Sequence, residues 1–511
     1  MKKLPIGIQS FSELRKAGYL YVDKTDLIFQ LATQGKYYFL SRPRRFGKSL
    51  LVSTLSHLFQ GNKELFEGLW IYDQWDWQTL PVIHLSFNNF GYKELGLEKA
   101  LTQRLEKIAN SFGISLSEEV NSLRFKELIE ELHKLRGQVV VLIDEYDKPI
   151  LDYLDDVPKA EAHRELLKSF YSILKDADPH LRLVLLTGVS KFSRVSIFSE
   201  LNNLNDLTIY SDYATLLGYT QDELEHYFAD RLEQLAPQFG GRESLLAQIK
   251  QWYNGYSWDT KHYVYNPFSI LNFFAKKSFE NFWFETGTPT FLVKLLRKDM
   301  KYDFDKVQAS SAALGSFEIE RIHPITLLFQ TGYLTISAKD EDMIYTLSYP
   351  NKEVRHSLLQ HLLAEYTQES PSDAFVNSRQ MKRALEQQDI DSFSQAINSL
   401  FASIPYQIFI VDQEAYYHLV IFLALSLMDT FVQAEVSMAR GRPDAVVHTT
   451  DTIYVLEFKL AQSAEAALTQ IKEKGYATQY LGQGKQVTAV GFNFNPEKKA
   501  IDQWLEEEMH N

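Results

Sequence analysis

The chain has 511 residues, which at about 150 residues per domain corresponds to about three domains and excludes a miniprotein or a single small binding module. Hydrophobic residues make up 45% and charged residues 23%, so the composition is that of a globular protein and excludes wholesale disorder. The formal net charge of −13, from 53 Lys and Arg against 66 Asp and Glu, excludes a generally basic, polyanion-binding surface. Any surface for nucleic acid must therefore be local.

Cysteine is absent from the sequence. Its absence excludes a disulfide framework, a thiolate nucleophile and a cysteine-ligated metal centre, and it fits a reducing setting. The longest apolar stretch, Leu419–Met428, is ten residues long, whereas a membrane-spanning helix needs about 20. We therefore expect no membrane partner and a cytoplasmic location.

Short apolar runs alternate with longer segments of helical period over residues 1–214. The runs are almost uninterrupted, which is typical of strands buried on both faces. Strand candidates are 37–40, 81–85, 139–143 and 183–186, and the clearest helix candidate is 49–59. Strands and helices in this alternating order predict an α/β fold with a doubly wound parallel sheet.

Residues 215–368 have a different character. Thr220–Glu223 has the pattern of a capping box, and aromatic residues crowd 252–283, so we predict a helical lid here. Further elements are a helix at 325–330 and strands at 333–336 and 345–348. This order is compatible with a winged helix. Because the turn between the strands is acidic, a role in packing and a role in DNA binding both stay open.

The last region, 369–511, begins with a polar stretch, 369–373, that predicts a linker. Ser463 is predicted to cap a helix that runs on to Tyr480. The other elements are a helix at 418–428, an alternating segment at 431–438 and strands at 444–448, 452–458 and 486–494. We predict an α/β module of about 140 residues, a normal domain size.

A phosphate-binding loop is the first candidate site. A predicted strand runs into the order Gly47-Lys48-Ser49 at the start of a helix. Glycine lets backbone N–H groups approach phosphate oxygens, lysine reaches the β- and γ-phosphates, and the serine hydroxyl can ligate Mg²⁺. The general pattern has another glycine where this chain has Arg42. We assign Arg45 and the Gly47-Lys48-Ser49 triplet to ATP; the alternative for Lys48 is a solvated loop lysine.

Two carboxylates, Asp144 and Glu145, follow the predicted strand 139–143, at the end where doubly wound sheets bind ligands. We predict that Asp144 orients Mg²⁺ and that Glu145 activates water; a helix cap or a salt bridge is the alternative for Glu145. The next strand ends beside Asp144, so Thr187 or Ser190 is a candidate contact for the γ-phosphate, against a role in capping its own turn.

A second constellation lies near the carboxyl end. Asp444 is followed, after twelve intervening residues, by Glu457 and then by Lys459. On adjacent strands the two carboxylates can converge, and Lys459 points the same way because strand side chains repeat every two residues. Carboxylates that hold Mg²⁺ and a lysine that positions water suit a nuclease. Glu435 is a candidate additional acid, and an ordinary cross-strand salt-bridge face is the alternative.

Five segments of the chain carry a family resemblance. They are Tyr-Val-Asp-Lys-Thr at 21–25, Arg-Pro-Arg-Arg-Phe-Gly-Lys-Ser at 42–49, Ile-Asp-Glu-Tyr-Asp at 143–147, Thr-Gly-Val-Ser at 187–190 and Trp-Tyr-Asn-Gly-Tyr at 252–256. Together they resemble the bacterial AAA-ATPase-like family that carries a nuclease-like carboxyl-terminal domain. The resemblance implies a P-loop ATPase core in which Lys48 and Ser49 contact phosphate and magnesium, with Asp144 and Glu145 as the second motif. It also implies that Arg194 acts as an arginine finger or sensor, with a structural salt bridge as the alternative.

The carboxyl-terminal constellation is similar to that of the PD-(D/E)XK nuclease superfamily, which implies a restriction-endonuclease-like fold. The resemblance assigns Asp444 and Glu457 to the metal and Lys459 to catalysis. Glu435 resembles the upstream acid of such sites. Gln470, on the helix that follows, resembles a glutamine found in some members.

These observations predict an enzyme: an ATPase whose nucleotide state gates a Mg²⁺-dependent nuclease acting on DNA. The alternative is a nucleotide-dependent switch or scaffold whose nuclease-like domain only binds nucleic acid or a protein. Assembly into a homo-oligomer, with Arg194 acting in trans, stays open.

Overall fold

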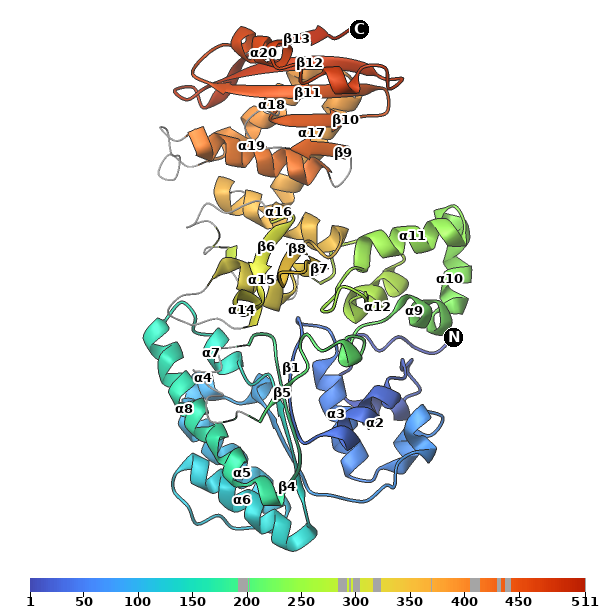
Figure 1. Cartoon of the computed structure of the whole chain (residues 1–511), viewed down its shortest axis with the longest axis vertical. Coiled ribbons are helices and arrows are strands. Elements are labelled where there is room, and N and C mark those ends of the chain that lie inside the picture. The colour runs from blue at the N-terminus through green and yellow to red at the C-terminus, as the bar shows by residue number, and fades with distance from the viewer. Residues whose placement is uncertain are drawn as a thin grey trace. The chain divides into compact units, whose positions relative to one another are not determined.

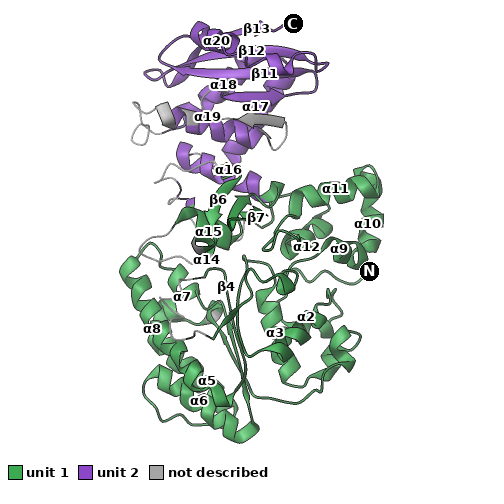
Figure 2. Ribbon diagram, viewed as in Figure 1, with its two compact units in different colours: residues 1–292, 304–353 green, residues 293–303, 354–511 purple. Residues whose placement is uncertain are grey.

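The computed structural model describes residues 1–191, 201, 203–283, 292, 293, 296, 304–315, 323–368, 370–404, 414–429, 433–436 and 443–510. The chain divides into two compact units: unit 1 holds residues 1–292 and 304–353, and unit 2 holds 293–303 and 354–511 (Figure 2). The three regions expected from the sequence are a finer division, and their boundaries stay a prediction. Within the described ranges, no helix is both long and apolar enough to cross a membrane.

A parallel five-stranded sheet of order β2-β3-β4-β1-β5 lies at the centre of residues 1–214. Its strands are β1 (Tyr37–Ser41), β2 (Val82–Ser86), β3 (Val139–Asp144), β4 (Leu181–Gly188) and β5 (Asn205–Asp206). The helices are α1 (Phe11–Lys16), α2 (Thr25–Gln34), α3 (Lys48–Phe59), α4 (Tyr92–Leu95), α5 (Leu97–Ser111), α6 (Asn121–Arg136), α7 (Lys148–Leu151) and α8 (Val157–Asp176). Figure 1 shows α5, α6 and α8 on one side of the sheet and α2 and α3 on the other. The doubly wound parallel fold is confirmed.

The apolar strands explain why this sheet forms the core of unit 1. Every residue of β1 and β3 is buried, and Leu40, Leu142 and Leu185 pack in one cluster with Leu51 and Leu55 of α3. Each fully buried leucine side chain contributes roughly 2 kcal/mol. Because the strands are parallel, the carboxyl ends of β2, β3 and β4 meet at one edge of the sheet.

A helical region follows, with α9 (Gln221–Tyr227), α10 (Ala229–Leu235), α11 (Arg242–Tyr253) and α12 (Pro267–Lys276). The capping box is confirmed, since the Thr220 side chain accepts from the backbone of Glu223 while the Glu223 side chain accepts from the backbone of Thr220. The aromatic residues form a core of their own, in which Phe228 and Phe274 stack with ring centroids 4.8 Å apart.

A three-stranded antiparallel sheet of order β6-β8-β7 completes unit 1. Its elements are β6 (Val307–Ser310), α14 (Ser311–Gly315), α15 (Pro324–Thr331), β7 (Thr335–Lys339) and β8 (Ile344–Ser348). Strand β6 was not predicted. The strand expected from Tyr333 begins at Thr335 instead, because the backbone N–H groups of Tyr333 and Leu334 both donate to the Leu328 carbonyl and close the end of α15.

Unit 2 contains a mixed sheet of order β13-β12-β11-β10-β9, in which only the β11–β12 pair is parallel among the described pairings. Its elements are α16 (Lys352–Thr367), whose first two residues belong to unit 1, α17 (Pro371–Glu386), α18 (Ile390–Ala402), α19 (Glu414–Asp429), β9 (Gln433–Val436), β10 (Ala445–His448), β11 (Thr452–Leu460), α20 (Ala464–Glu473), β12 (Gln486–Asn495) and β13 (Ala500–Glu508). This α/β arrangement agrees with the predicted nuclease-like fold class.

Two local predictions in unit 2 are wrong. Most of the expected linker is helical, because Ser370 caps α17 and Pro371 occupies its first turn. The helix capped by Ser463 ends at Glu473 rather than at Tyr480, since Gly475 adopts a positive φ of 63° that breaks the helical path.

Candidate functional site

The phosphate loop joins β1 to α3, and its backbone takes two left-handed turns. Arg45 has φ 67°, and Gly47, directly before α3, has φ 95°. The Lys48 Nζ donates to the carbonyl oxygens of Arg42 at 2.8 Å and Pro43 at 2.9 Å, so the loop curls around this ammonium group. Burial lowers the pKa of Lys48, although Glu145 and other nearby carboxylates oppose the change. An anionic ligand would offset that burial.

Asp144 is held by hydroxyl groups on both of its oxygens. Ser49 Oγ donates to Asp144 Oδ2 at 2.6 Å, and Thr187 Oγ1 donates to Asp144 Oδ1 at 2.7 Å. The structure thus brings these three predicted residues together from α3, β3 and β4. A carboxylate beside a serine hydroxyl at a helix start is an oxygen donor set of the kind that Mg²⁺ takes together with phosphate oxygens.

Glu145 follows Asp144 in a left-handed conformation, with φ 53°. Burial raises the pKa of the Glu145 carboxyl, while Lys48 and a hydrogen bond with the Asn88 side chain act to lower it. Asn88 was not predicted as a site residue. It comes just after β2, whose last residue Ser86 pairs with Asp144, and only the order of the strands in space makes it a neighbour.

A third carboxylate, Asp147, to which sequence reasoning gave no role, fixes the backbone at the end of β4. It is 1% exposed, and its Oδ2 accepts from the backbone N–H groups of Val189 at 3.0 Å and Ser190 at 2.6 Å. The Ser190 hydroxyl donates to the same oxygen at 2.7 Å. The Ser190 hydroxyl therefore donates its hydrogen bond to Asp147, whereas the Thr187 hydroxyl donates to Asp144.

The pocket above these groups has a volume of about 480 Å³, within the usual range for small-molecule sites. Its polar lining includes Arg44, Arg45, Gly47, Lys48, Ser49, Asn88, Glu145, Asp147 and Lys148. Apolar and aromatic lining comes from Pro5, Ile8, Leu151, Tyr219, Pro267, Phe268 and Leu271. Arg45 spans the two parts, because its guanidinium lies 5.0 Å from the centre of the Phe268 ring. A pocket with a cationic and an apolar part suits a nucleotide.

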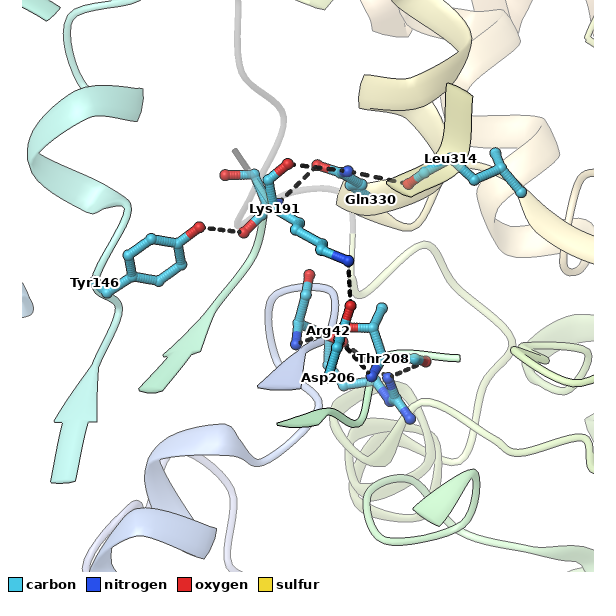
Figure 3. A network of polar contacts seen from close by, with 9 residues as sticks. Arg42, Tyr146, Lys191, Asp206, Thr208, Leu314 and Gln330 are labelled. Atoms are coloured by element: carbon cyan, nitrogen blue, oxygen red, sulfur yellow. Dashed lines mark hydrogen bonds and ion pairs between the residues drawn. The ribbon is translucent and has the colours of Figure 1, made fainter. Parts of the chain in front are cut away.

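Arg42, which stands where the general pattern has glycine, is buried behind the loop. It donates to the carbonyl oxygens of Ser41 at 2.9 Å and Thr208 at 2.8 Å (Figure 3). Thr208 N–H donates to Asp206 at 2.9 Å, and Asp206 pairs with the Lys191 ammonium group. Burial lowers the pKa of Arg42 to about 9. Its guanidinium thus has a structural place in the protein.

Lys191 links the exit of β4 to α15. Its backbone N–H donates to Gln330 Oε1 at 2.9 Å, and the Gln330 amide also donates to the Leu314 carbonyl at 3.3 Å (Figure 3). The predicted finger or sensor, Arg194, comes shortly afterwards and lies outside the described residues. Its role stays a prediction.

The carboxyl-terminal constellation converges within unit 2. Asp444 directly precedes β10, and Glu457 and Lys459 lie on β11. Asp444 Oδ2 accepts from the Phe458 N–H at 2.8 Å, and Asp444 N–H donates to Glu457 Oε2 at 3.4 Å. Lys459 Nζ lies 3.1 Å from Glu457 Oε1. The side chains of Asp444, Glu457 and Lys459 therefore lie next to one another on the sheet.

Gln470 joins this group from α20. Lys459 Nζ donates to Gln470 Oε1 at 2.7 Å, and Gln470 Nε2 donates to Glu457 Oε1. Glu435 lies on β9, where it pairs with Val446 of β10, but its side chain is outside the described residues. The structure thus assembles Asp444, Glu457, Lys459 and Gln470 and leaves the predicted contribution of Glu435 a prediction.

Burial, followed by the nearby Asp444 carboxylate, raises the pKa of Glu457 to about 7. Two close carboxylates with one lysine fit a divalent cation, which would offset their repulsion. In the part of the chain that the structure describes, no cluster of three or more His, Asp or Glu side chains suited to a metal is present. Among the described side chains, Asp444 and Glu457 are the carboxylates that would hold such a cation.

Comparison with known families gives two matches. A model of the AAA-ATPase-like family, described as a predicted AAA-ATPase, matches residues 5–198. A model of the PD-(D/E)XK nuclease superfamily matches residues 412–504. The first match contains the phosphate loop and the Asp144–Glu145 pair, and the second contains the Asp444 constellation.

Among individual proteins, the chain is 41% identical over 515 residues to an uncharacterized protein encoded in the vnfD 5' region of Azotobacter chroococcum, with 98% of each chain covered. Among solved structures, it is similar to the Orc1 protein of Aeropyrum pernix in complex with DNA, with 12% identity and a TM-score of 0.24, over 66% of this chain and 90% of that one. A structural likeness this weak supports no conclusion about fold or ligand.

Proposed function

Because the chain belongs to the AAA-ATPase-like family with a carboxyl-terminal PD-(D/E)XK nuclease-superfamily domain, we propose that it is an ATPase whose nucleotide state gates a Mg²⁺-dependent DNA nuclease. The observation that carries this proposal is the convergence of Asp444, Glu457 and Lys459, because two carboxylates and a lysine that lie together are a set of groups suited to metal-dependent phosphodiester cleavage. The phosphate pocket of unit 1 supports the ATPase half.

In the ATPase half, the loop N–H groups and Lys48 would bind the β- and γ-phosphates at the start of α3. Ser49 and Asp144 would hold Mg²⁺, which supplies charge neutralisation on the phosphate oxygens. Glu145 would accept a proton from the attacking water, and Asn88, its hydrogen-bond partner, would orient the carboxylate.

The apolar lining of the same pocket would take the base and the ribose. Pro5 and Ile8 contribute from the amino-terminal segment, and Tyr219 and Phe268 contribute from the helical region. Bases bind well between apolar and aromatic surfaces because every base has a large apolar face.

In the nuclease half, Asp444 and Glu457 would hold Mg²⁺, which lowers the pKa of a bound water and neutralises charge on the scissile phosphate. Lys459 would orient the attacking water or stabilise the phosphate charge, and Gln470 would hold the Lys459 ammonium group through its 2.7 Å hydrogen bond. We propose DNA as the substrate because the match to the PD-(D/E)XK nuclease superfamily covers the Asp444 constellation.

The proposal is tested with purified full-length protein, linear and circular DNA and Mg²⁺, with and without ATP. Lys48→Ala and Lys459→Ala proteins are assayed beside the wild type. Cleavage that depends on Lys459, and that changes with ATP only when Lys48 is present, supports the proposal.

Two results contradict it in different ways. Cleavage that is indifferent to ATP and to Lys48→Ala would remove the gating mechanism. Absence of cleavage under every condition would contradict the nuclease activity. It would favour the alternative hypothesis, a nucleotide-dependent switch or scaffold whose nuclease-like domain only binds nucleic acid or a protein.

A further inference from the structure

The aromatic segment after α11 has no part in the proposed chemistry, yet it packs directly behind the phosphate loop. Trp258 lies face-on to Arg42, with the guanidinium carbon 3.9 Å from the ring centre. Phe46, the loop residue before Gly47, meets Tyr256 edge-on at 4.8 Å and Trp258 at 5.6 Å between ring centroids. We call Tyr256 and Trp258 together the aromatic clamp.

Burial shows how closely the aromatic clamp and the loop fit. Arg42, Phe46 and Tyr256 are each 1% exposed, and Trp258 is 6% exposed. Arg42 has no carboxylate among its hydrogen-bond partners in the described residues; it donates to backbone carbonyls and lies against the indole. A buried guanidinium over a desolvated aromatic face is a strong cation–π arrangement. The ring and the carbonyl oxygens therefore contact the guanidinium directly, while Asp206 and Asp259 act on its charge without a described hydrogen bond to it.

The loop needs such support because of its own backbone. It lacks the first glycine of the general pattern and forces Arg45 into a left-handed conformation that disfavours a side chain. The carbonyls of Arg42 and Pro43 hold the Lys48 ammonium group, so a shift of Arg42 would carry Lys48 with it. The position of Arg42 thus sets the position of the phosphate-binding lysine.

The aromatic clamp is itself rigidly seated. Between the two residues in the sequence lies Ser257, whose N–H donates to Thr335 Oγ1 at 2.7 Å, and the same hydroxyl donates to the Ser257 carbonyl at 3.0 Å. Gly255 precedes it with φ 109°, and a Cβ there would lie 1.9 Å from the Pro350 carbonyl oxygen. Only glycine fits, which explains the glycine in the Tyr-Asn-Gly-Tyr motif.

We propose that Tyr256 and Trp258 are positioning residues for nucleotide binding, which hold the phosphate loop from behind through Phe46 and Arg42 in place of the missing glycine. The inference rests only on the nucleotide-binding half of the proposed function. By fixing the loop before the ligand arrives, the aromatic clamp lowers the ordering cost of binding. Its loss should therefore weaken affinity for nucleotide while the folded protein persists.

The test measures the Kd of full-length protein for a fluorescent ATP analogue with Mg²⁺, beside the thermal unfolding temperature. Trp258→Leu keeps apolar bulk and removes the aromatic face, and Arg42→Met removes the charge from the other side of the contact. The double variant completes a cycle. Trp258→Tyr restores an aromatic face and serves as the rescue variant.

A matched control comes from the same helical region. Trp252 also lies beside a cation, with Lys352 Nζ 5.1 Å from its ring centre, and its described ring contacts are with Tyr253 and Phe279 rather than with loop residues. Trp252→Leu therefore reports the general cost of losing a tryptophan–cation contact.

We expect Trp258→Leu and Arg42→Met each to weaken binding about tenfold, the double variant to add little more, and Trp258→Tyr to recover most of the affinity. Trp252→Leu should lower the unfolding temperature without changing Kd. Equal Kd values for wild type and Trp258→Leu, or equal losses in Trp252→Leu, would overturn the inference. A wild-type protein that binds no nucleotide would overturn the proposed function instead.

Discussion

The two candidate sites draw on very different lengths of chain. The carboxyl-terminal site takes Asp444, Glu457, Lys459 and Gln470 from two neighbouring strands and the helix that follows. The nucleotide site takes groups from α3, from the ends of β2, β3 and β4 and, behind the loop, from the aromatic segment near Trp258. A local site is fixed by its spacing in sequence, whereas a dispersed one depends on contacts that only folding creates.

The sites also differ in how their charges are satisfied. At the carboxyl-terminal site, Glu457 is paired with Lys459 and both are bonded to Gln470. At the nucleotide site, Asp144 and Asp147 are held instead by hydroxyl and N–H groups. Neutral donors orient Asp144 and Asp147, whereas at the carboxyl-terminal site the Lys459 ammonium group offsets part of the negative charge of Glu457.

Removing one lysine from each site tests most strongly whether the two sites differ in function. Lys48→Met should lower ATP binding and hydrolysis by about 100-fold or more, and Lys459→Met should lower DNA cleavage by a similar factor, because each removes a cation from a phosphate site. Lys459→Met should leave ATP binding unchanged. The measurements are ATP turnover, nucleotide Kd and cleavage of labelled DNA by each protein. Loss of nucleotide binding in Lys459→Met would show that the sites are not separate.

More of the carboxyl-terminal site than of the nucleotide site could be predicted from the sequence. The spacing of Asp444, Glu457 and Lys459 was enough to expect convergence, because side chains alternate along strands. The pairing of Thr187 with the Asp144 strand followed from the order of apolar runs. Asn88 was missed, since its polar side chain stands beside Glu145 only through the placement of β2 next to β3.

The packing of the aromatic clamp against the phosphate loop also could not be predicted from the sequence. The contact of Arg42 with Trp258 joins segments far apart in the chain, and a single sequence carries no signal of such pairing. By contrast, the early end of α20 could have been anticipated from Gly475, a residue that favours a helix end.

A buried carboxylate, Glu353, holds a residue that contacts the phosphate loop, and its pKa should make the free energy of unfolding depend on pH. Glu353 is fully buried and accepts from Trp283 N–H at 2.8 Å and Ser269 Oγ at 2.7 Å, while the Trp283 indole donates to the Arg44 carbonyl of the loop at 3.0 Å. Burial raises the pKa of Glu353 to about 7. Because the folded protein holds this proton more tightly than the unfolded chain, the contribution to stability is full below about pH 4.5 and falls as pH rises through 7.

Glu353→Gln is neutral at every pH, so it should gain stability relative to wild type as pH rises, by at most about 3 kcal/mol between pH 5 and pH 8. Urea unfolding of both proteins at the two pH values gives the difference. A difference that is the same at pH 5 and pH 8 would contradict the raised pKa of this buried carboxyl.

A smaller effect should follow when Asp144 loses one of its hydroxyl partners. Thr187→Val removes the 2.7 Å hydrogen bond to Asp144 Oδ1 while keeping the shape of the side chain, at a cost of about 2 kcal/mol in transition-state stabilisation, or roughly 30-fold in ATP turnover. Thr326→Val is the matched control, since Thr326 is also buried and donates only to a backbone carbonyl. Equal ATP turnover in Thr187→Val and Thr326→Val would contradict the orienting role.

The smallest effect is expected at Gln470. Gln470→Leu should slow DNA cleavage about fivefold to tenfold, because Lys459 loses the neutral acceptor that holds its ammonium group. ATP turnover should stay at the wild-type level. Cleavage that is unaffected in Gln470→Leu would mean that Glu457 alone positions Lys459.

The central claim, that nucleotide at the first site controls chemistry at the second, is tested most directly by the rate of DNA cleavage as a function of ATP concentration, in wild type and in Trp258→Leu. The account predicts that cleavage changes with half-saturation near the nucleotide Kd, and that Trp258→Leu moves both values about tenfold in the same direction. A cleavage rate that is flat across all ATP concentrations, in a protein that binds ATP, would contradict it.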